Sequence, residues 1–419
     1  MALCVVRSRH GLVRPSEKTP TTTLQLSALD KVPVLRCNAR SLHVYKEGGE
    51  GAAAAIREAI SKALVLYYPL AGRLKDSSQL SEGLQLECCG EGVWFVEASA
   101  SCTLDALNYL YEDAASISYQ QDDLLPNQVP TLTQFECGGF VIGLVLSHTI
   151  CDGLGAAQFL NAVGELARGV HHLSVSPVWC RDLFQSPPTP PQQPPPPPMP
   201  NYRLEQANVD ISFEQINKLK QDFQASTGQR CSSFEVVAAT FWTSRTRAIH
   251  SNQDNSDQLL TFIFFANCRQ LLEPPLPEGF YGNCFFPVTI TASRKWVAEA
   301  SYVEIIKLIQ QGKANLPNEF AKYSKGELNQ GEYPFFPPVS YNTLFLSEWG
   351  RLGFNDVDFG WGPPANIVAI QGSAILPAGI VGWLPPAAPK KGIRLMTWCV
   401  EEAHRHSFLD HVMKFFNSN

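Results

Sequence analysis

The stretch Phe140–Gly153, FVIGLVLSHTICDG, decides how this chain is interpreted. Residues 140–147 form an apolar run, which is typical of a buried strand. After the loop that carries His148, the apolar residues recur at helical spacing. From Asp152 onward, one helix face would hold Leu154, Phe159 or Leu160, Val163 and Leu166. The sequence therefore predicts a strand, a short histidine-bearing loop and a helix.

His148 in that loop is a candidate general base. The flanking strand and helix would hold its imidazole in a fixed place, and histidine changes its protonation state close to neutral pH. The competing interpretation is a hydrogen-bonded core histidine beside an apolar strand. Cys151 is a possible nucleophile, but a helix that begins near Asp152 would turn the thiol away from His148. Asp152 itself could orient His148 as in a triad, or cap the helix.

Four more segments carry recognisable patterns. They are Tyr68–Leu74 (YPLAGRL), Asn267–Asn283 (NCRQLLEPPLPEGFYGN), Ser347–Leu352 (SEWGRL) and Asp358–Gly362 (DFGWG). With the H-x-x-x-D-G pattern of residues 148–153, they resemble the motifs of the BAHD family of plant acyl-CoA-dependent acyltransferases. The five motifs stand in the family's order and span nearly the whole chain. Leu24–Asp30 (LQLSALD) looks closest to the branch that contains the taxane acyltransferases.

The alternation of strand and helix patterns in both halves suggests two α/β domains, as does the length of 419 residues. The resemblance implies two chloramphenicol-acetyltransferase-like α/β sandwich domains with a solvent channel between them. We expect domains at 1–185 and 203–419, with a segment near 357–378 packing on the first. The proline-rich run within 186–202 cannot join a sheet or helix interior, which favours an extended linker. A ligand for a proline-recognition module is the alternative.

The resemblance also implies a role for each motif residue. His148 would take the proton of the acceptor, and Trp349 and Ser347 would stabilise the oxyanion. Asp152, next to Gly153, would pair with Arg269 and fix the loop, while Leu271 replaces a basic residue common in the family. The DFGWG loop would be structural, and it comprises Asp358, Phe359, Gly360, Trp361 and Gly362. Ser232 and Ser233, at the start of a predicted helix, match coenzyme A contacts of the family.

Composition excludes several classes of function. The net charge is −6 and no basic run is visible, which argues against nucleic acid. No apolar run reaches the length of a membrane helix, and the N-terminus has no signal-peptide pattern. The twelve cysteines lack a C-x-x-C pair, so we expect reduced thiols, no metal and a cytoplasmic location.

The sequence thus predicts a monomeric acyltransferase with acyl-CoA as co-substrate and no permanently bound cofactor. The acyl group would pass directly to a hydroxyl of a terpenoid or related specialised metabolite, with an acetyl or benzoyl donor. No G-x-S-x-G pattern that would support an acyl-enzyme is present. The alternatives are a hydroxycinnamoyl-CoA O- or N-acyltransferase, a thioester hydrolase, and a catalytically silent interaction protein. Residues that line a substrate pocket are scattered through a sequence, so donor and acceptor stay open.

Overall fold

The computed structural model describes residues 3–76, 83–111, 121–183, 200, 202–249, 258–328, 333–370, 375–385 and 391–417. Most of the proline-rich run lies outside these residues. The chain forms two compact units. Unit 1 comprises Met1–Pro188, Leu272–Cys284 and Arg351–Gly372, and unit 2 comprises Thr189–Leu271, Phe285–Gly350 and Ser373–Asn419. Each unit is thus assembled from separate stretches of the chain.

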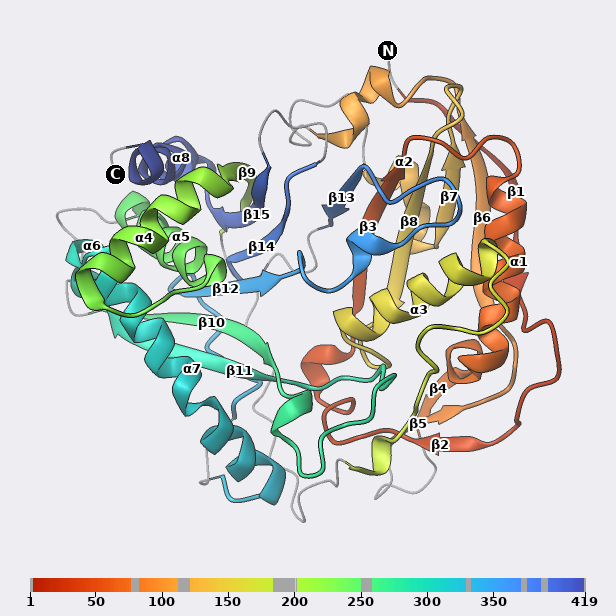
Figure 1. Cartoon of the computed structure of the whole chain (residues 1–419), viewed down its shortest axis with the longest axis horizontal. Helices are drawn as coiled ribbons and strands as arrows, with labels where there is room; N and C mark the ends of the chain where they lie inside the picture. Colours follow the sequence, from red (N-terminus) through yellow and green to blue (C-terminus); the bar gives the residue numbers. More distant parts are fainter. Residues whose placement is uncertain are drawn as a thin grey trace. The chain divides into compact units, whose positions relative to one another are not determined.

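Unit 1 is built on a six-stranded sheet in the order β1-β6-β7-β8-β3-β13 (Figure 1). Its strands are β1 (Val5–Val13), β3 (Asn38–Tyr45), β6 (Val93–Ala100), β7 (Thr131–Gln134), β8 (Phe140–Ser147) and β13 (Asn366–Ala369). The β6–β7 pair is parallel and the other pairs are antiparallel, so the sheet is mixed. A small sheet adds β2 (Thr23–Gln25), β5 (Leu84–Glu87) and β4 (Arg73–Asp76).

Two helices pack on each other beside this sheet, α1 (Ala52–Leu66) and α3 (Gly153–Ala167), as Figure 1 shows. Their buried side chains are mostly small, and they meet Phe95, Leu132 and Phe140 of the strands in one core. The short helix α2 (Gln121–Leu124) belongs to a second cluster, with Leu42 and Val44 of β3. The end of β8 and the start of α3 are therefore held between packed layers.

Unit 2 has its own six-stranded mixed sheet, β11-β10-β12-β14-β15-β9. The strands are β9 (Glu205–Ser212), β10 (Leu259–Asn267), β11 (Phe285–Ser293), β12 (Thr343–Glu348), β14 (Ala378–Trp383) and β15 (Gly392–Val400). The helices are α4 (Phe213–Thr227), α5 (Ser233–Ile249), α6 (Arg294–Glu299), α7 (Tyr302–Lys325) and α8 (Glu402–Asn417). Helix α5 is buried along nearly its whole length and forms the centre of this core.

Local sequence signals explain where several helices begin and end. Ser212 and Ser301 open α4 and α7 with capping boxes, which satisfy backbone N–H groups that have no partner inside the helix. Gly228 ends α4 at φ +71°, a conformation that favours glycine. In the part of the chain that the structure describes, no helix is both long enough and apolar enough to cross a membrane.

The predicted strand at 140–147 is confirmed at the expected residues, and the predicted helix begins at Gly153, directly after Asp152. On α3, Leu160 and Val163 of the predicted face are buried, together with small residues such as Ala156. The strand–loop–helix arrangement around His148 is therefore established.

Candidate active site

His148 lies where β8 ends, one loop before α3. Its backbone N–H donates to the carbonyl of Cys37 at 2.9 Å, and the hydroxyl of Thr149 donates to the carbonyl of Leu35 at 3.0 Å. Thr149 and Ile150 are buried, whereas His148 is half-buried. The loop is thus tied to the chain before β3, while its histidine keeps part of its surface exposed.

The amide of Asn283 is a polar partner of the imidazole. Oδ1 of Asn283 lies 3.2 Å from Nδ1 of His148. The Nδ2 group of the same amide donates to the carbonyls of His148, at 2.8 Å, and Thr149, at 3.3 Å, and to Oδ1 of Asp30, at 2.8 Å. One fully buried side chain therefore contacts both the ring and the backbone of the histidine loop.

Behind Asn283 lies a buried ion pair between Asp30 and Arg181, whose side chains are 0% and 1% exposed. Nε of Arg181 lies 2.8 Å from Oδ2 of Asp30, as a charge contact whose N–H direction does not meet hydrogen-bond geometry. Burial raises the pKa of Asp30, and the charge of Arg181 and the hydrogen bonds from Asn283 and Ser27 oppose that rise. Charge and hydrogen bonding offset part of the cost of burying this carboxylate, and the net direction of its pKa is upward.

The side chain of Arg181 contacts a backbone carbonyl and aromatic rings in addition to Asp30. Its Nη2 donates to the carbonyl of Ile150 at 2.7 Å, and its guanidinium carbon lies 4.2 Å from the ring centre of Trp179 and 4.9 Å from that of Phe280. A Cβ at Gly282 would lie 1.6 Å from Nη1, so only glycine allows this close approach.

Asp152 caps α3, as expected for one of its two possible roles. Its Oδ1 accepts from the N–H of Gly155 at 3.0 Å, and its Oδ2 accepts from the N–H of Cys284 at 3.1 Å. The second bond ties the helix start to the segment that carries Asn283. The predicted ion pair with Arg269, which belongs to unit 2, stays a prediction. Arg269 itself donates to Oδ1 of Asn267 at 3.3 Å.

Cys151 is 1% exposed and packs within the core of unit 1. A thiol must be accessible and at least partly ionised to act as a nucleophile. The burial of Cys151 therefore counts against an acyl-cysteine intermediate. The sequence likewise predicts that the thiol points away from His148.

The loop 358–362 is held by its own backbone and by aromatic packing. Oδ1 of Asp358 accepts from the N–H of Gly360 at 2.7 Å and of Gly362 at 2.9 Å, and these glycines have φ of +110° and +88°. The side chain of Phe359 is buried against Tyr45, and the ring of Trp361 meets Phe140. Asp358 thus uses its carboxylate to shape a turn.

Ser347 and Trp349 lie at the end of β12 in unit 2. Ser347 is paired with Ile380 in the parallel β12–β14 ladder, and the N–H of Trp349 donates to the carbonyl of Val381 at 2.7 Å. Both side chains are half-buried. The β-ladder therefore positions the backbone of each predicted oxyanion donor.

Ser232 and Ser233 open α5, as the sequence predicts. The hydroxyl of Ser232 accepts from the N–H of Glu235 at 3.2 Å, and the carboxylate of Glu235 accepts from the N–H of Ser232 at 2.9 Å. This helix start therefore already carries a negative charge, balanced by Lys313 at 2.5 Å from Glu235. A phosphate at this helix end would therefore compete with the Glu235 carboxylate for the N–H of Ser232, and the predicted contact with coenzyme A stays a prediction.

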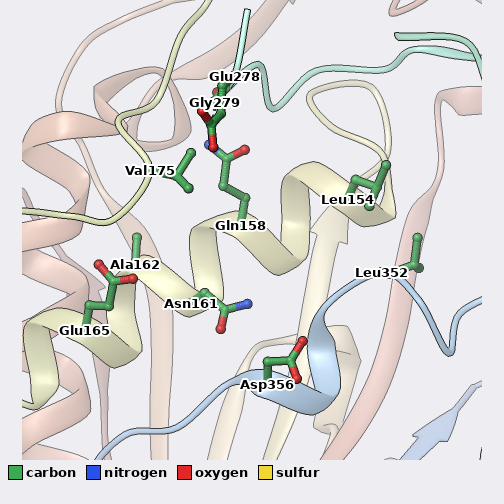
Figure 2. A pocket seen from close by; sticks show the side chains of 10 residues that line it. All are labelled: Leu154, Gln158, Asn161, Ala162, Glu165, Val175, Glu278, Gly279, Leu352 and Asp356. Carbon is green, nitrogen blue, oxygen red and sulfur yellow. Dashed lines mark hydrogen bonds between the residues drawn. The ribbon is translucent and has the colours of Figure 1, made fainter. Parts of the chain in front are cut away.

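A cavity of about 430 Å³ runs along α3 in unit 1 (Figure 2). Its lining includes the acidic residues Glu165, Glu278 and Asp356 and no lysine or arginine. Figure 2 shows Gln158 pointing toward Gly279, whose carbonyl accepts from it at 2.9 Å. Because its charged groups are all carboxylates, the cavity is unsuited to the phosphates of coenzyme A.

Sequence reasoning did not assign a role to Asp30, Arg181 or Asn283. Asp30 and Asn283 lie inside the motif segments 24–30 and 267–283. Their position as polar residues within a motif could have marked them as candidate site residues. Arg181 lies outside every motif and gave no such signal. Among the described residues, no group of three or more His, Cys, Asp or Glu could hold a metal ion.

Comparisons with known proteins find similar sequences along nearly the whole chain. A family model described as the Transferase family matches residues 4–374. The chain is 40% identical to "Acyl transferase 4" of Oryza sativa subsp. japonica, over 99% of this chain and 100% of the relative. It is 36% identical to "Myricetin 3-O-glucosyl 1,2-rhamnoside 6'-O-caffeoyltransferase AT2" of Crocosmia x crocosmiiflora, over 99% and 100%. It is 35% identical to "3'-N-debenzoyl-2'-deoxytaxol N-benzoyltransferase" of Taxus canadensis, over 95% and 93%.

Two solved structures share the fold. Vinorine synthase superposes with a TM-score of 0.72 at 21% identity, over 98% of each chain. TRI101 of F. sporotrichioides, complexed with coenzyme A and T-2, superposes with a TM-score of 0.71 at 12% identity, over 95% of this chain and 98% of that one. The two-domain α/β fold with mixed sheets is confirmed.

Proposed function

This chain belongs to the Transferase family, the BAHD acyl-CoA acyltransferases, and from that premise we propose that it transfers an acyl group from a coenzyme A thioester to the hydroxyl of a specialised metabolite. The observation that carries the proposal is the half-buried imidazole of His148, fixed at a strand end by the buried amide of Asn283. A general base needs both properties, since it must reach substrate yet keep its orientation.

In the proposed reaction, His148 removes the proton of the acceptor hydroxyl as its oxygen attacks the thioester carbonyl. The C–S bond of the tetrahedral intermediate then breaks, and the imidazolium returns its proton to the departing thiolate. No residue becomes acylated, which fits the burial of Cys151. Such general-base assistance contributes roughly 10²- to 10⁴-fold to the rate.

Trp349 and Ser347 are the proposed donors to the oxyanion. An indole N–H can only donate a hydrogen bond, and one donor to an oxyanion can stabilise the transition state by about 3 kcal/mol. Ser232 and Ser233 are proposed to contact coenzyme A through their hydroxyls, because Glu235 already occupies the start of α5. The solvent channel between the domains stays a prediction from the resemblance.

An acetyl or benzoyl donor and a bulky terpenoid or related alcohol are the favoured substrates. The benzoyl-transferring relative from Taxus supports that choice, although its name describes transfer to nitrogen. A second candidate, hydroxycinnamoyl transfer to oxygen or nitrogen, is favoured by the caffeoyltransferase relative at 36% identity. We also propose that the protein acts as a cytoplasmic monomer; its molar mass in solution, measured by light scattering, tests the oligomeric state.

The test is a mass-spectrometric panel of the purified protein with acetyl-, benzoyl- and coumaroyl-CoA, each with pooled alcohols or pooled amines. We expect an acylated alcohol and free coenzyme A in equal amounts. Acylated amine alone would replace the O-acyl proposal by N-acylation. Free acid without an acceptor would identify a hydrolase, and no product with any pair would favour the interaction protein.

A further inference from the structure

We propose that Asp30 and Arg181 are positioning residues that act on His148 through Asn283, and that together they set which ring nitrogen of His148 holds the lone pair. The inference rests on the proposed function, because it explains how the general base is prepared. It concerns side chains from three distant parts of the chain, which the fold of unit 1 brings together.

The orientation of the Asn283 amide follows from its surroundings. One end of the amide faces the carbonyl oxygens of His148 and Thr149 and a carboxylate oxygen of Asp30. Oxygens of this kind only accept hydrogen bonds, so the end that faces them is the NH₂ group. The amide oxygen Oδ1 is consequently the end that faces the ring of His148.

The tautomer of His148 follows in turn. Oδ1 of Asn283 can only accept, and it lies 3.2 Å from Nδ1 of His148, within the range of an N–H···O bond. Nδ1 must then carry the hydrogen. A neutral imidazole has one N–H, so Nε2 holds the lone pair. Nε2 is therefore the nitrogen that would take the proton of the acceptor.

Asp30 and Arg181 keep the amide in this orientation. Oδ1 of Asp30 accepts from Asn283, while Oδ2 accepts from the N–H of Ser27 at 3.1 Å and pairs with Arg181. Arg181 also donates to the carbonyl of Ile150 in the histidine loop. The pair thus contacts the amide through Asp30 and the loop through Arg181, and a rotation of Asn283 would break its bonds to Asp30 and to the carbonyls of His148 and Thr149.

If Asn283 had only a structural role, its loss would leave the tautomer of His148 unchanged. The tautomer is therefore the quantity to measure. In protein labelled with ¹⁵N-histidine, the ring nitrogen shifts of His148 distinguish Nδ1–H from Nε2–H. We expect Nδ1–H in the wild type and a gain of Nε2–H in Asn283→Ala. We also expect kcat/KM to fall about 10- to 100-fold in Asn283→Ala, by analogy with groups that orient other imidazoles.

Asn366→Ala is the matched control, because Asn366 is also a buried amide of unit 1 and donates to the carbonyls of Leu110 and Tyr109. It should leave both the tautomer and kcat/KM unchanged. Any loss of stability common to buried asparagines will appear in this variant too.

Asp30→Asn is the second variant, for the case in which Asn283→Ala does not fold. The new amide oxygen would face Arg181 and Ser27, so its NH₂ would lie against the NH₂ of Asn283 and weaken the preference for the present orientation of that amide. A gain of the Nε2–H form in either variant supports the inference. An unchanged Nδ1–H form in every variant that folds would overturn it, as would an Nε2–H wild type.

These outcomes are separable from those of the proposed function. If His148→Ala keeps full turnover, the base assignment fails whatever the tautomer is. If His148→Ala is inactive but His148 keeps the Nδ1–H form in folded Asn283→Ala and Asp30→Asn, only the positioning inference fails.

Discussion

The histidine motif at 148–153 and the loop at 358–362 are both family motifs with an aspartate and a glycine, yet their polar groups make different kinds of contact. Around His148, the partners come from distant segments: Asn283 contacts the ring, and Arg181 donates to the backbone of Ile150. In the second loop, the carboxylate of Asp358 bonds to the N–H groups of its own turn. Long-range contacts reach the second loop too, from Arg168 to the carbonyl of Asp358 and from Tyr45 to Phe359, so the histidine loop is distinguished by the half-buried ring that its polar contacts hold.

The largest loss of stability should come from Asp152→Ala. The substitution removes the cap of α3, worth about 1 kcal/mol, and leaves the N–H of Cys284 without this acceptor, at a further cost of about 1–3 kcal/mol. Urea unfolding should show a decrease of about 2–4 kcal/mol in the free energy of unfolding. Asp152→Asn, which keeps an acceptor oxygen at the cap, should lose less; equal losses would contradict the capping account.

The proposed pair of Asp152 with Arg269 is tested by adding Arg269→Ala. If the two side chains pair, the double variant should lose less stability than the sum of the single losses, by about 1 kcal/mol or more. Purely additive losses would remove the ion pair from the account and leave Asp152 as a cap alone.

Asp358→Ala should have an intermediate effect and sharpen the contrast between the loops. Two backbone N–H groups lose their acceptor, at about 1 kcal/mol each. The midpoint of thermal unfolding should fall, while kcat/KM per folded molecule at low temperature stays close to wild type. A large loss of kcat/KM in fully folded Asp358→Ala would break the distinction between a chemical and a shaping loop.

Cys151→Ala should have the smallest effect. The buried thiol loses packing worth about 1 kcal/mol, and turnover should persist because no acyl-cysteine forms. Intact-mass spectrometry after mixing wild type with acyl-CoA should likewise find no acylated protein. An acyl adduct that is lost in Cys151→Ala would restore the covalent alternative.

Much of the fold could be predicted because short-range patterns decide it. The apolar run at 140–147 and the cap at Asp152 predicted the strand and the start of the helix, since both signals depend only on neighbours in sequence. Residues 272–284, by contrast, belong to unit 1 although they lie within the range predicted for the second domain. Their place is set by contacts such as the bond from Cys284 to Asp152, which no local pattern encodes.

The candidate site also has one part that short-range sequence patterns predict and one part that they do not. Histidine in a strand–loop–helix pattern and the family resemblance were enough to select His148. The buried pair of Asp30 and Arg181 could not be predicted, because each is an ordinary charged residue until the fold removes it from water. At the start of α5, the predicted contacts of Ser232 and Ser233 with coenzyme A stay a prediction, and the bond from the N–H of Ser232 to Glu235 is a feature that sequence reasoning did not include.

The proposed role of His148 as the general base of an acyl-CoA acyltransferase can be tested by comparing kcat/KM of His148→Ala with that of His406→Ala. His406 is an exposed histidine of α8, so its loss controls for the removal of an imidazole. With the donor and acceptor found by the panel, we expect His148→Ala to lose about 10²- to 10⁴-fold in kcat/KM. The thermal midpoint should stay near that of the control. Turnover of folded His148→Ala equal to that of His406→Ala would contradict the account.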